Sequence, residues 1–448
     1  MQRNVVFLVF DTLRKDSLYP YNLNLDTPAI SKFAQESIIF PNAISPASWT
    51  LPAHGSFFTG KYPSKSGIRE DLNDLSDFSY LMDTYDGRTL SEIFLRSGYN
   101  TYNFSQNGLI GEDTGYSRGF QINKYTKNDF QERNTRLLHN FNKISTKWGG
   151  EPLSILKSIV NNKNPIEFCK SYVELKRDTN WFKENDMTDK GGLLTIENIE
   201  NQRLQEPFFL FINLMEMHDP HDYLSLKISW QDSVFGRSDR LSKFGAEIYQ
   251  SYLRTTLVLD RIVGKLLSIL TRQNLLENTL IVLTSDHGQS FFEEKNYYGH
   301  GNFLLDKIIE IPLIVRLPNS KKFSVNEGYQ STCGLYETIP QIAIEDVNFD
   351  NITSELCFSE VYGSMDKEIS KYSNTKDFQQ KYNKLNTVKK AVYKDGYKLV
   401  LELTNGGIEE FKKNGENVST DSEKEKFKEL VDEINTFSWN ENLVYPQP

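Results

Sequence analysis

Runs that are wholly or mostly apolar, and rich in β-branched and aromatic residues, recur along the chain. They occupy residues 5–10, 207–215, 279–284 and 311–316. Runs of this kind are typical of strands buried on both faces of a parallel sheet. Apolar residues with helical spacing and the end signals around them predict helices at residues 27–36, 89–97 and 248–270. A further strand is predicted at residues 99–105, directly after the glycine that ends the second helix.

The pattern changes near residue 370, where short alternating strands (390–393 and 398–403) and a charged helix (421–437) replace the buried runs. A chain of 448 residues is long for one core, so we expect a large domain, residues 1–370, and a smaller one, residues 371–448. Residues 125–195 are richer in Lys, Asn, Asp and Glu. This segment is predicted to be a variable helical insertion, a place for a lid or a substrate-selecting element.

Polar residues follow the predicted strands at their carboxyl ends. Asp11 follows the first strand, Asn107 follows residues 99–105, His218 and His221 follow residues 207–215, and Asp286 precedes His287 after residues 279–284. Ligands of open α/β sheets bind just outside these ends. Together with a hydroxyl group, two carboxylates and an imidazole suit a borderline or hard divalent cation such as zinc or manganese.

The stretch 45–60, SPASWTLPAHGSFFTG, is predicted to be a loop that turns into a helix. Pro52 is compatible with a first helical turn, so Thr50 lies near a helix N-terminus. Free N–H groups and the helix dipole attract a phosphate or sulfate group there. His54 falls on the same face one turn later. Taken alone, the same pattern also fits an N-capping Thr and a surface histidine.

Composition narrows the classes of protein. The formal net charge is −9 and no dense basic block occurs, which argues against nucleic acid or an anionic membrane surface as partner. No apolar run approaches the roughly 20 residues of a membrane span. The three cysteines, Cys169, Cys333 and Cys357, lie far apart and are interpreted as reduced thiols. We therefore expect a soluble, unprocessed, cytoplasmic protein.

Five motifs together carry a family resemblance: NVVFLVFDTLRKDSL, TPAISKF, SWTLPAHGSFFTGKYPSKSGI, TLIVLTSDHG and YGHGN. In order and spacing, the chain resembles the sulfatase branch of the alkaline-phosphatase superfamily over most of residues 4–125 and 207–318. One departure stands out. Sulfatases carry a Cys or Ser that matures to formylglycine, whereas this chain has Thr50, which cannot form that aldehyde. In this respect it resembles the phosphodiesterases and phosphoglycerol transferases of the family.

The resemblance implies a three-layer αβα domain with a mostly parallel sheet, followed by a small C-terminal α+β subdomain with an antiparallel sheet. It also implies one divalent metal ion (manganese, zinc, magnesium or calcium) held by Asp11, Thr50, Asp286 and His287. Metal coordination is what converts a weakly nucleophilic Thr hydroxyl into an alkoxide. The matching Thr of the family attacks the ester, so Thr50 is the predicted nucleophile.

Five of the six histidines lie in the matched motifs, and His139 does not. His221 resembles the substrate-contacting His of the family, and His300 stands where many sulfatases have a Lys that grips the leaving-group oxygen. Either imidazole suits protonation of a departing alkoxide. His54, which replaces the Arg of the sulfatase pattern, is assigned to substrate binding with His218. His218 alternatively orients His221 or helps to hold a second metal.

Asn107 is likewise assigned to substrate binding, with a loop cap as the alternative. Arg14 and Lys61 lie near motifs, where they fit either contact with an anionic substrate or ordinary solvated charges.

The predicted activity is metal-dependent hydrolysis of a phosphate or sulfate ester through a covalent threonine intermediate. Because the formylglycine route is closed, a phosphodiester or phosphonate monoester is favoured. Two alternatives stay open: a transferase that passes the group to an alcohol, and a non-catalytic relative that binds an anion or glycan. The expected partner is a small-molecule, glycan- or lipid-derived ester. The organic part of that substrate and the oligomeric state are not predicted.

Overall fold

The computed structural model describes most of the chain, and the statements below concern that part. The described residues are 2–69, 81–126, 132–134, 136–137, 140, 165–222, 225, 242–345, 354–363, 383, 385–439, 441 and 443–446. The predicted domain boundary at residue 370, His139, the side chain of Cys169 and much of the 125–195 segment lie outside them.

An eight-stranded sheet forms the centre of the fold, in the order β11-β2-β10-β7-β1-β6-β4-β5. Its strands are β1 (Asn4–Phe10), β2 (Ile38–Ile39), β4 (Asn100–Ser105), β5 (Ile122–Tyr125), β6 (Phe208–Leu214), β7 (Thr279–Thr284), β10 (Leu313–Arg316) and β11 (Ser324–Val325). β1 pairs in parallel with both β6 and β7, and β4 pairs in parallel with β6 and β5. β10 runs antiparallel to β7, so the sheet is mixed but mostly parallel, as predicted.

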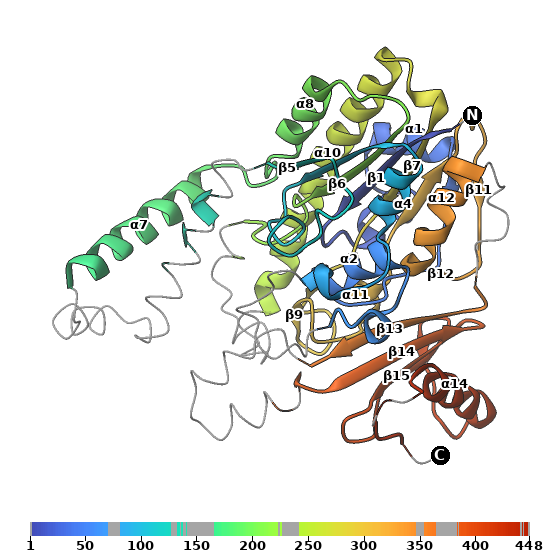
Figure 1. The fold of residues 1–448 in the computed structure, drawn as a ribbon. Helices are drawn as coiled ribbons and strands as arrows, with labels where there is room; N and C mark the ends of the chain where they lie inside the picture. Colours follow the sequence, from blue (N-terminus) through green and yellow to red (C-terminus); the bar gives the residue numbers. More distant parts are fainter. Residues whose placement is uncertain are drawn as a thin grey trace.

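Helices cover both faces of this sheet because successive side chains of each strand point to opposite sides. In β1, Val6, Leu8 and Phe10 belong to one core, and Val5, Phe7 and Val9 belong to the other. The first face is covered by α1 (Pro28–Gln35), α8 (Gly192–Gln202) and α10 (Ser242–Arg272). The opposite face is covered by α2 (Thr50–Thr59), α4 (Leu90–Arg96) and α12 (Leu335–Glu345) (Figure 1). The predicted three-layer αβα domain is confirmed.

The elements predicted along the chain are confirmed with small shifts of their ends. α4 begins with a capping box formed by Thr89 and Glu92, and α10 begins earlier than the apolar period indicated. α7 (Pro165–Glu184) extends away from the body of the protein in Figure 1. The shorter elements are η1 (Lys15–Ser17), β3 (Ala43–Ile44), α3 (Pro63–Ser66), η2 (Leu81–Thr84), η4 (Leu276–Asn278), β8 (Ser290–Phe291), β9 (Tyr298–Gly299), α11 (Asp306–Ile309), β12 (Gln330–Ser331) and η5 (Thr332–Gly334).

A separate antiparallel sheet follows, with α14 (Lys424–Phe437) packed against it (Figure 1). Its strands, in spatial order, are β13 (Leu356–Tyr362), β14 (Val388–Lys394), β15 (Tyr397–Glu402), β16 (Gly407–Lys413) and β17 (Glu416–Asn417). The predicted C-terminal α+β subdomain is therefore present. Its first strand, β13, precedes residue 371, the residue at which the sequence pattern placed the start of the smaller domain.

Strand β13 also joins this sheet to the loop that leads into α2. The Glu360 N–H donates to the Pro46 carbonyl at 2.9 Å, and Glu360 forms an isolated bridge with Ala47. The Glu360 carboxylate accepts from the Ser64 N–H at 3.0 Å and pairs with Lys390 at 2.9 Å, both side chains being fully buried. The antiparallel sheet therefore braces the segment just before Thr50.

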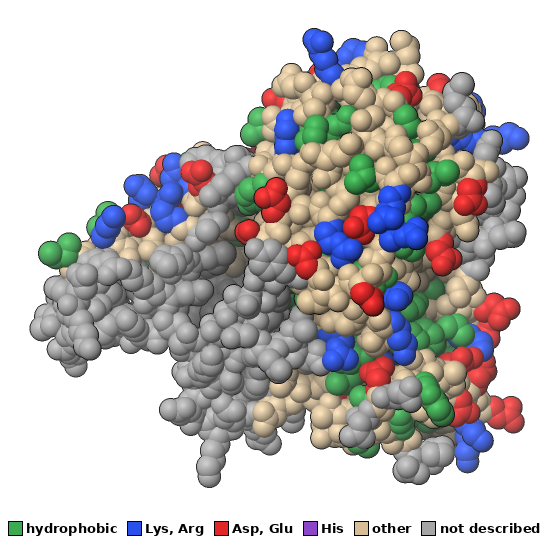
Figure 2. All heavy atoms as spheres, in the orientation of Figure 1, with side chains coloured by type: hydrophobic (Ala, Val, Ile, Leu, Met, Phe, Trp, Pro, Cys, Tyr) green, Lys and Arg blue, Asp and Glu red, His purple; other side chains and the backbone are tan. Residues whose placement is uncertain are grey.

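The surface agrees with the composition. Lys and Arg side chains are interspersed with Asp and Glu on the face drawn in Figure 2, without a block of one sign. Cys333 and Cys357 are buried free thiols. Among the helices of the described ranges, none combines the length and apolar character that a membrane crossing needs.

Candidate active site

The polar residues predicted at strand ends meet at one edge of the central sheet. Adjacent strands β7, β1, β6 and β4 are parallel, so their carboxyl ends open on the same side. Asp286 and His287 follow β7, Asp11 follows β1, and Asn107 follows β4. The fold therefore brings together residues that are up to 276 positions apart in sequence.

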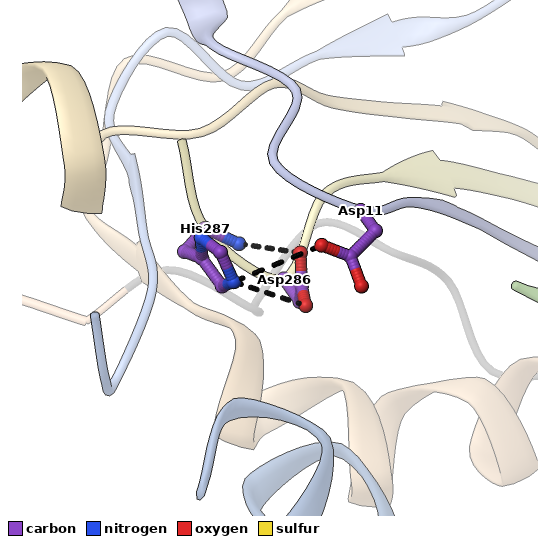
Figure 3. Close-up of side chains that lie close together, drawn as sticks. All are labelled: Asp11, Asp286 and His287. Atoms are coloured by element: carbon purple, nitrogen blue, oxygen red, sulfur yellow. Dashed lines mark hydrogen bonds and ion pairs between the residues drawn. The ribbon is translucent and has the colours of Figure 1, made fainter. Parts of the chain in front are cut away.

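Asp11, Asp286 and His287 face one another, and each offers a ligand atom within 4.8 Å of the others (Figure 3). His287 Nε2 lies 3.5 Å from Asp286 Oδ2 and 3.9 Å from Asp11 Oδ1. Thr50 completes the group: its Oγ1 lies 3.4 Å from Asp11 Oδ2 and 3.4 Å from His287 Nε2. We call these four residues the strand-end cluster.

The backbone around the strand-end cluster directs the lone pairs inward. Thr12 has a φ of 60°, an uncommon value for a residue other than glycine, and its N–H donates to Asp286 Oδ1 at 3.2 Å. The His287 N–H donates to the same oxygen at 2.8 Å. His287 Nδ1 lies 2.9 Å from the Gly288 carbonyl and must donate to it, so Nε2 keeps its lone pair.

These residues fit a divalent metal ion. Asp11 Oδ1 and Asp286 Oδ2 are buried and accept no hydrogen bond within the described part of the chain. Burial raises the pKa of Asp11 to about 6 and that of Asp286 to about 7, with their mutual repulsion adding for Asp11. A cation between the two oxygens would remove this penalty. Burial lowers the pKa of His287 to about 4, which keeps the ring neutral, as a ligand must be.

Thr50 is the first residue of α2, and Trp49 precedes it in extended conformation. The Thr50 hydroxyl is directed to Asp11 and His287 and makes no capping bond, so the N-cap alternative does not describe it. All ten residues of α2 are buried. The N-terminus of this helix therefore points at the strand-end cluster from inside the protein, with the side chain of Thr50 at its tip.

His54 lies in the core beneath the cluster, which differs from the predicted substrate contact. Its ring is fully buried, Nδ1 donates to the Thr50 carbonyl at 2.9 Å, and Nε2 accepts from the Asn213 amide at 3.1 Å. Burial lowers the pKa of His54 to about 3. His54 Nδ1 is also 3.5 Å from Asp286 Oδ2, so this ring supports the cluster and has no face left for a substrate.

Asn107 orients a carboxylate of the cluster. Its amide donates to Asp11 Oδ2 at 2.9 Å, while its carbonyl oxygen accepts from the Leu109 N–H at 2.9 Å. The side chain thus acts as a loop cap, the alternative weighed for it, and holds Asp11 at the same time.

The remaining motif histidines lie around a second group of side chains. His221 is buried, with Nε2 3.1 Å from Asp219 Oδ1 and its ring packed on Tyr252 and Phe291. It points to Asp219, and a direct substrate contact does not follow from this position. His300 lies between Gly299 (φ 110°) and Gly301 (φ 96°), conformations that favour glycine.

The ring centroid of His300 is 4.4 Å from that of His287 and 5.3 Å from that of His218. Burial, followed by the neighbouring histidines, lowers the pKa of His300 well below its usual value. We call Asp219, His221, Gln289, Tyr298 and His300 the hairpin cluster, since three of its members belong to or flank the β8–β9 hairpin.

Several residues of the site gave no signal in the sequence. Lys190 is buried, its ammonium group donates to the His218 carbonyl, and it lies within electrostatic range of Asp219, Glu216 and Asp11. Burial lowers the pKa of Lys190 to about 8. Its position in the polar, motif-free 125–195 segment gave no signal.

For Arg14, two roles were left open, contact with an anionic substrate and a solvated charge, and the structure fits neither. Arg14 is buried and bonded to Asp16 and Glu293, at 2.8 Å and 2.6 Å, with its guanidinium over the Tyr249 ring. Arg14 is therefore neither a solvated surface charge nor a group that is free to bind an anionic substrate. Lys61 is exposed, with its ammonium 5.3 Å from the Tyr85 ring.

Solved structures of other proteins share this fold. A phosphonate monoester hydrolase of Agrobacterium radiobacter superposes with a TM-score of 0.62 at 14% identity, covering 100% of both chains. A putative sulfatase from Bacteroides thetaiotaomicron superposes with a TM-score of 0.69 at 15% identity, covering 99% of this chain and 95% of that one. At such identities the likeness concerns the fold, which is the α/β fold of sulfatases and alkaline-phosphatase-like enzymes.

Residues 3–343 match the family model described as Sulfatase, and the chain belongs to the sulfatase family. Among curated relatives, the ulvan-active sulfatase of Formosa agariphila is 25% identical over 330 residues. That match covers 71% of this chain and 57% of the relative, so the chain spans little more than half of that protein's length. The family resemblance predicted from the motifs is confirmed.

Proposed function

We propose that this chain is a metal-dependent hydrolase of phosphate or sulfate esters, with phosphodiesters or phosphonate monoesters as preferred substrates and Thr50 as nucleophile. The observation that carries the proposal is the position of the Thr50 hydroxyl, 3.4 Å from both Asp11 and His287 at the N-terminus of a buried helix. Membership of the sulfatase family and the likeness to a phosphonate monoester hydrolase support the same class of reaction.

The strand-end cluster is proposed to hold one divalent ion through Asp11, Thr50, Asp286 and His287. Three oxygen ligands and one imidazole are compatible with manganese, zinc, magnesium or calcium. When bound, such an ion supplies Lewis-acid chemistry that favours the alkoxide form of the Thr50 hydroxyl.

The proposed reaction then has two steps, each carried out by residues of this chain. In the first step, Thr50 Oγ1 passes its proton to the His300 imidazole and forms a bond to phosphorus, while the bond from phosphorus to the leaving oxygen breaks and that oxygen takes the proton from the imidazole. In the second step, water passes a proton to the imidazole and bonds to phosphorus, the bond from phosphorus to Oγ1 breaks, and Oγ1 takes the proton from the imidazole, which restores the hydroxyl. The N–H groups that open α2 stabilise charge on the non-bridging oxygens in both steps. Lys190 adds a positive charge near Asp11.

Sulfate esters are proposed to be poor substrates. A formylglycine hydrate expels sulfate because it carries a second hydroxyl on the same carbon, and a sulfated Thr50 has none. A phosphorylated Thr50 is instead open to in-line attack by water. The organic part of the ester is proposed to derive from a glycan or a lipid, and the ulvan-active sulfatase of Formosa agariphila is a relative named for a glycan substrate.

A panel of p-nitrophenyl esters tests the proposal: the diester bis-p-nitrophenyl phosphate, p-nitrophenyl phenylphosphonate, p-nitrophenyl phosphate and p-nitrophenyl sulfate. We expect turnover of the first two to exceed turnover of the sulfate by at least about 10²-fold, with one metal equivalent per chain by elemental analysis. Acid quench and mass spectrometry should place the covalent adduct on the peptide that contains Thr50.

Faster steady turnover of the sulfate would contradict the proposed substrate class. An adduct that is released faster by added glycerol than by water, with a glycerol ester as product, would instead identify a transferase.

A further inference from the structure

Gln289 lies between two members of the hairpin cluster and is fully buried. Its amide nitrogen donates to Asp219 Oδ2 at 2.6 Å, and its amide oxygen lies 2.7 Å from His300 Nδ1. The residue follows the Asp286-His287-Gly288 turn and directly precedes β8 of the β8–β9 hairpin. His300 directly follows β9. The amide therefore connects the loop after β6 to the histidine that stands against His287.

Asp219 fixes the direction of that amide. An ionised carboxylate accepts hydrogen bonds and donates none. Oδ2 accepts from Gln289, while Oδ1 accepts from the Tyr298 hydroxyl at 2.5 Å and lies 3.1 Å from His221 Nε2. Burial alone would raise the pKa of Asp219, but the charge and hydrogen bond of His221 outweigh it and hold the pKa below its usual range.

Turning the Gln289 amide by half a turn would set its carbonyl oxygen against this carboxylate. The NH₂ group of Gln289 therefore faces Asp219, and its oxygen faces His300.

The His300 tautomer follows from the same geometry. An amide oxygen accepts hydrogen bonds only, so the Nδ1 atom at 2.7 Å must carry the proton. In the neutral ring, the lone pair then belongs to Nε2, on the side of the ring away from Gln289. We propose that Gln289, oriented by Asp219, is a positioning residue that holds His300 as the Nδ1–H tautomer, so that Nε2 acts as a proton acceptor beside the strand-end cluster.

This inference rests on the proposed function for its chemical consequence. In the second step, a water O–H proton passes to His300 Nε2 as the water oxygen bonds to phosphorus and the bond to Thr50 Oγ1 breaks. The imidazolium formed in this way has a proton on Nε2, which passes to Thr50 Oγ1 and restores the hydroxyl. In the first step the same nitrogen takes the Thr50 proton and gives it to the leaving oxygen. His300 thus serves as acceptor before it serves as donor in each step, and the leaving-group role predicted from the sequence is the donor half of the first step.

Nitrogen spectroscopy of the histidines tests the tautomer directly. The full chain is labelled with ¹⁵N-histidine, loaded with zinc and examined by long-range ¹H–¹⁵N correlation. With six histidines in the chain, a His300→Gln variant identifies the signals of His300. We expect a protonated Nδ1 and a bare Nε2 in the wild type. In Gln289→Leu, which keeps size but removes the acceptor, the selection is lost and kcat falls on the order of 10²-fold with unchanged metal content.

The double variant Asp219→Asn/Gln289→Glu is the matched rescue. There a carboxylate at position 289 accepts from both the amide at 219 and His300 Nδ1, so the wild-type tautomer should return.

A protonated Nε2 in the neutral wild-type ring, or an unchanged tautomer in Gln289→Leu, would overturn the proposal. A changed tautomer with unchanged kcat would overturn its catalytic half. The wild-type spectrum decides the first point even if Gln289→Leu fails to fold. Expected spectra from a protein that turns over no ester would leave the tautomer in place and sink the proposed function instead.

Discussion

The strand-end cluster and the hairpin cluster are both buried and both contain carboxylates and histidines, yet they differ in how their polar atoms are used. In the strand-end cluster, Asp11 Oδ1 and Asp286 Oδ2 face each other without a hydrogen-bond donor. In the hairpin cluster, both oxygens of Asp219 accept bonds from protein donors. Buried carboxylate oxygens without donors are costly unless a ligand joins them, whereas carboxylates with a donor on each oxygen hold other groups in place. The contrast separates a candidate metal site from its support.

The largest expected effect comes from Thr50→Ala. Removing the nucleophilic oxygen should lower kcat/KM by at least about 10⁴-fold, while the free energy of unfolding changes by at most about 1–2 kcal/mol. Thr50→Ser is the matched control and should keep part of the rate, because the hydroxyl survives and only β-branching is lost. Steady-state kinetics and chemical denaturation measure the two quantities. Activity of Thr50→Ala close to that of the wild type would remove Thr50 as nucleophile.

Metal retention should split the two clusters. Asp286→Ala is expected to reduce bound metal from one equivalent per chain to less than about a tenth, because it removes one of four buried ligands. Asp219→Ala removes a carboxylate that is equally close to motif histidines but already has its donors, and it should keep the metal. Elemental analysis after dialysis compares them. Equal metal loss in both variants would contradict the division between a metal-binding strand-end cluster and a supporting hairpin cluster.

His300→Ala should keep its metal and lose turnover. The expected loss of kcat/KM is about 10²-fold for an alkyl ester and smaller for a p-nitrophenyl ester, whose leaving group needs less protonation. His221→Ala is the comparison, since His221 contacts Asp219 and its loss should act equally on both substrates. Equal losses for the two esters in His300→Ala would remove the leaving-group role.

The smallest expected effect concerns Glu216, a buried carboxylate that accepts from the Gly192 N–H at 2.7 Å. Burial, with repulsion from Asp189 next, raises its pKa from 4.5 to about 7. The folded state therefore binds this proton more tightly than the unfolded chain does. The associated stability is complete below about pH 4.5 and disappears as the pH rises to about 7, a change of roughly 3 kcal/mol.

Glu216→Gln should flatten the dependence of the free energy of unfolding on pH in this window, for metal-loaded protein. Chemical denaturation at pH 4.5 and pH 8 measures the change. An unchanged slope in the variant would show that Glu216 does not hold the extra proton.

Much of the fold followed from local patterns. The runs that became β1, β6 and β7 are mostly apolar because both faces of the sheet are covered by helices, and their carboxyl ends located Asp11, Asp286 and His287. The direction of β10 did not follow, since a four-residue apolar run looks the same in a parallel and an antiparallel pairing. The first strand of the C-terminal sheet, β13, was not predicted, because residues 363–387 separate it in sequence from β14, the strand with which it pairs.

The supporting residues of the site could not be found in this way. Gln289 and Asp219 are 70 positions apart, and only the folded chain sets them side by side. His54 was expected at the surface or against a substrate, but α2 is buried on every side, so the usual polar face was not there to guide the assignment. Lys190 belongs to a polar segment whose composition indicates solvent exposure. In each case tertiary contacts determine the surroundings of the side chain, and the spacing of residues in the sequence does not indicate those contacts.

The brace between Glu360 and the Pro46–Ala47 loop has a consequence for exchanging parts among relatives. The recognisable family region ends at residue 343, whereas the backbone N–H that holds the loop before Thr50 belongs to Glu360, whose buried carboxylate accepts from the Ser64 N–H and pairs with Lys390. A chimera cut at the edge of the family match would keep Glu360 and Lys390 together but separate them from Pro46 and Ser64. Each buried hydrogen-bonding group left without its partner costs about 1–3 kcal/mol. The segment that similarity identifies as the family region is therefore shorter than the segment that must be transferred as one piece.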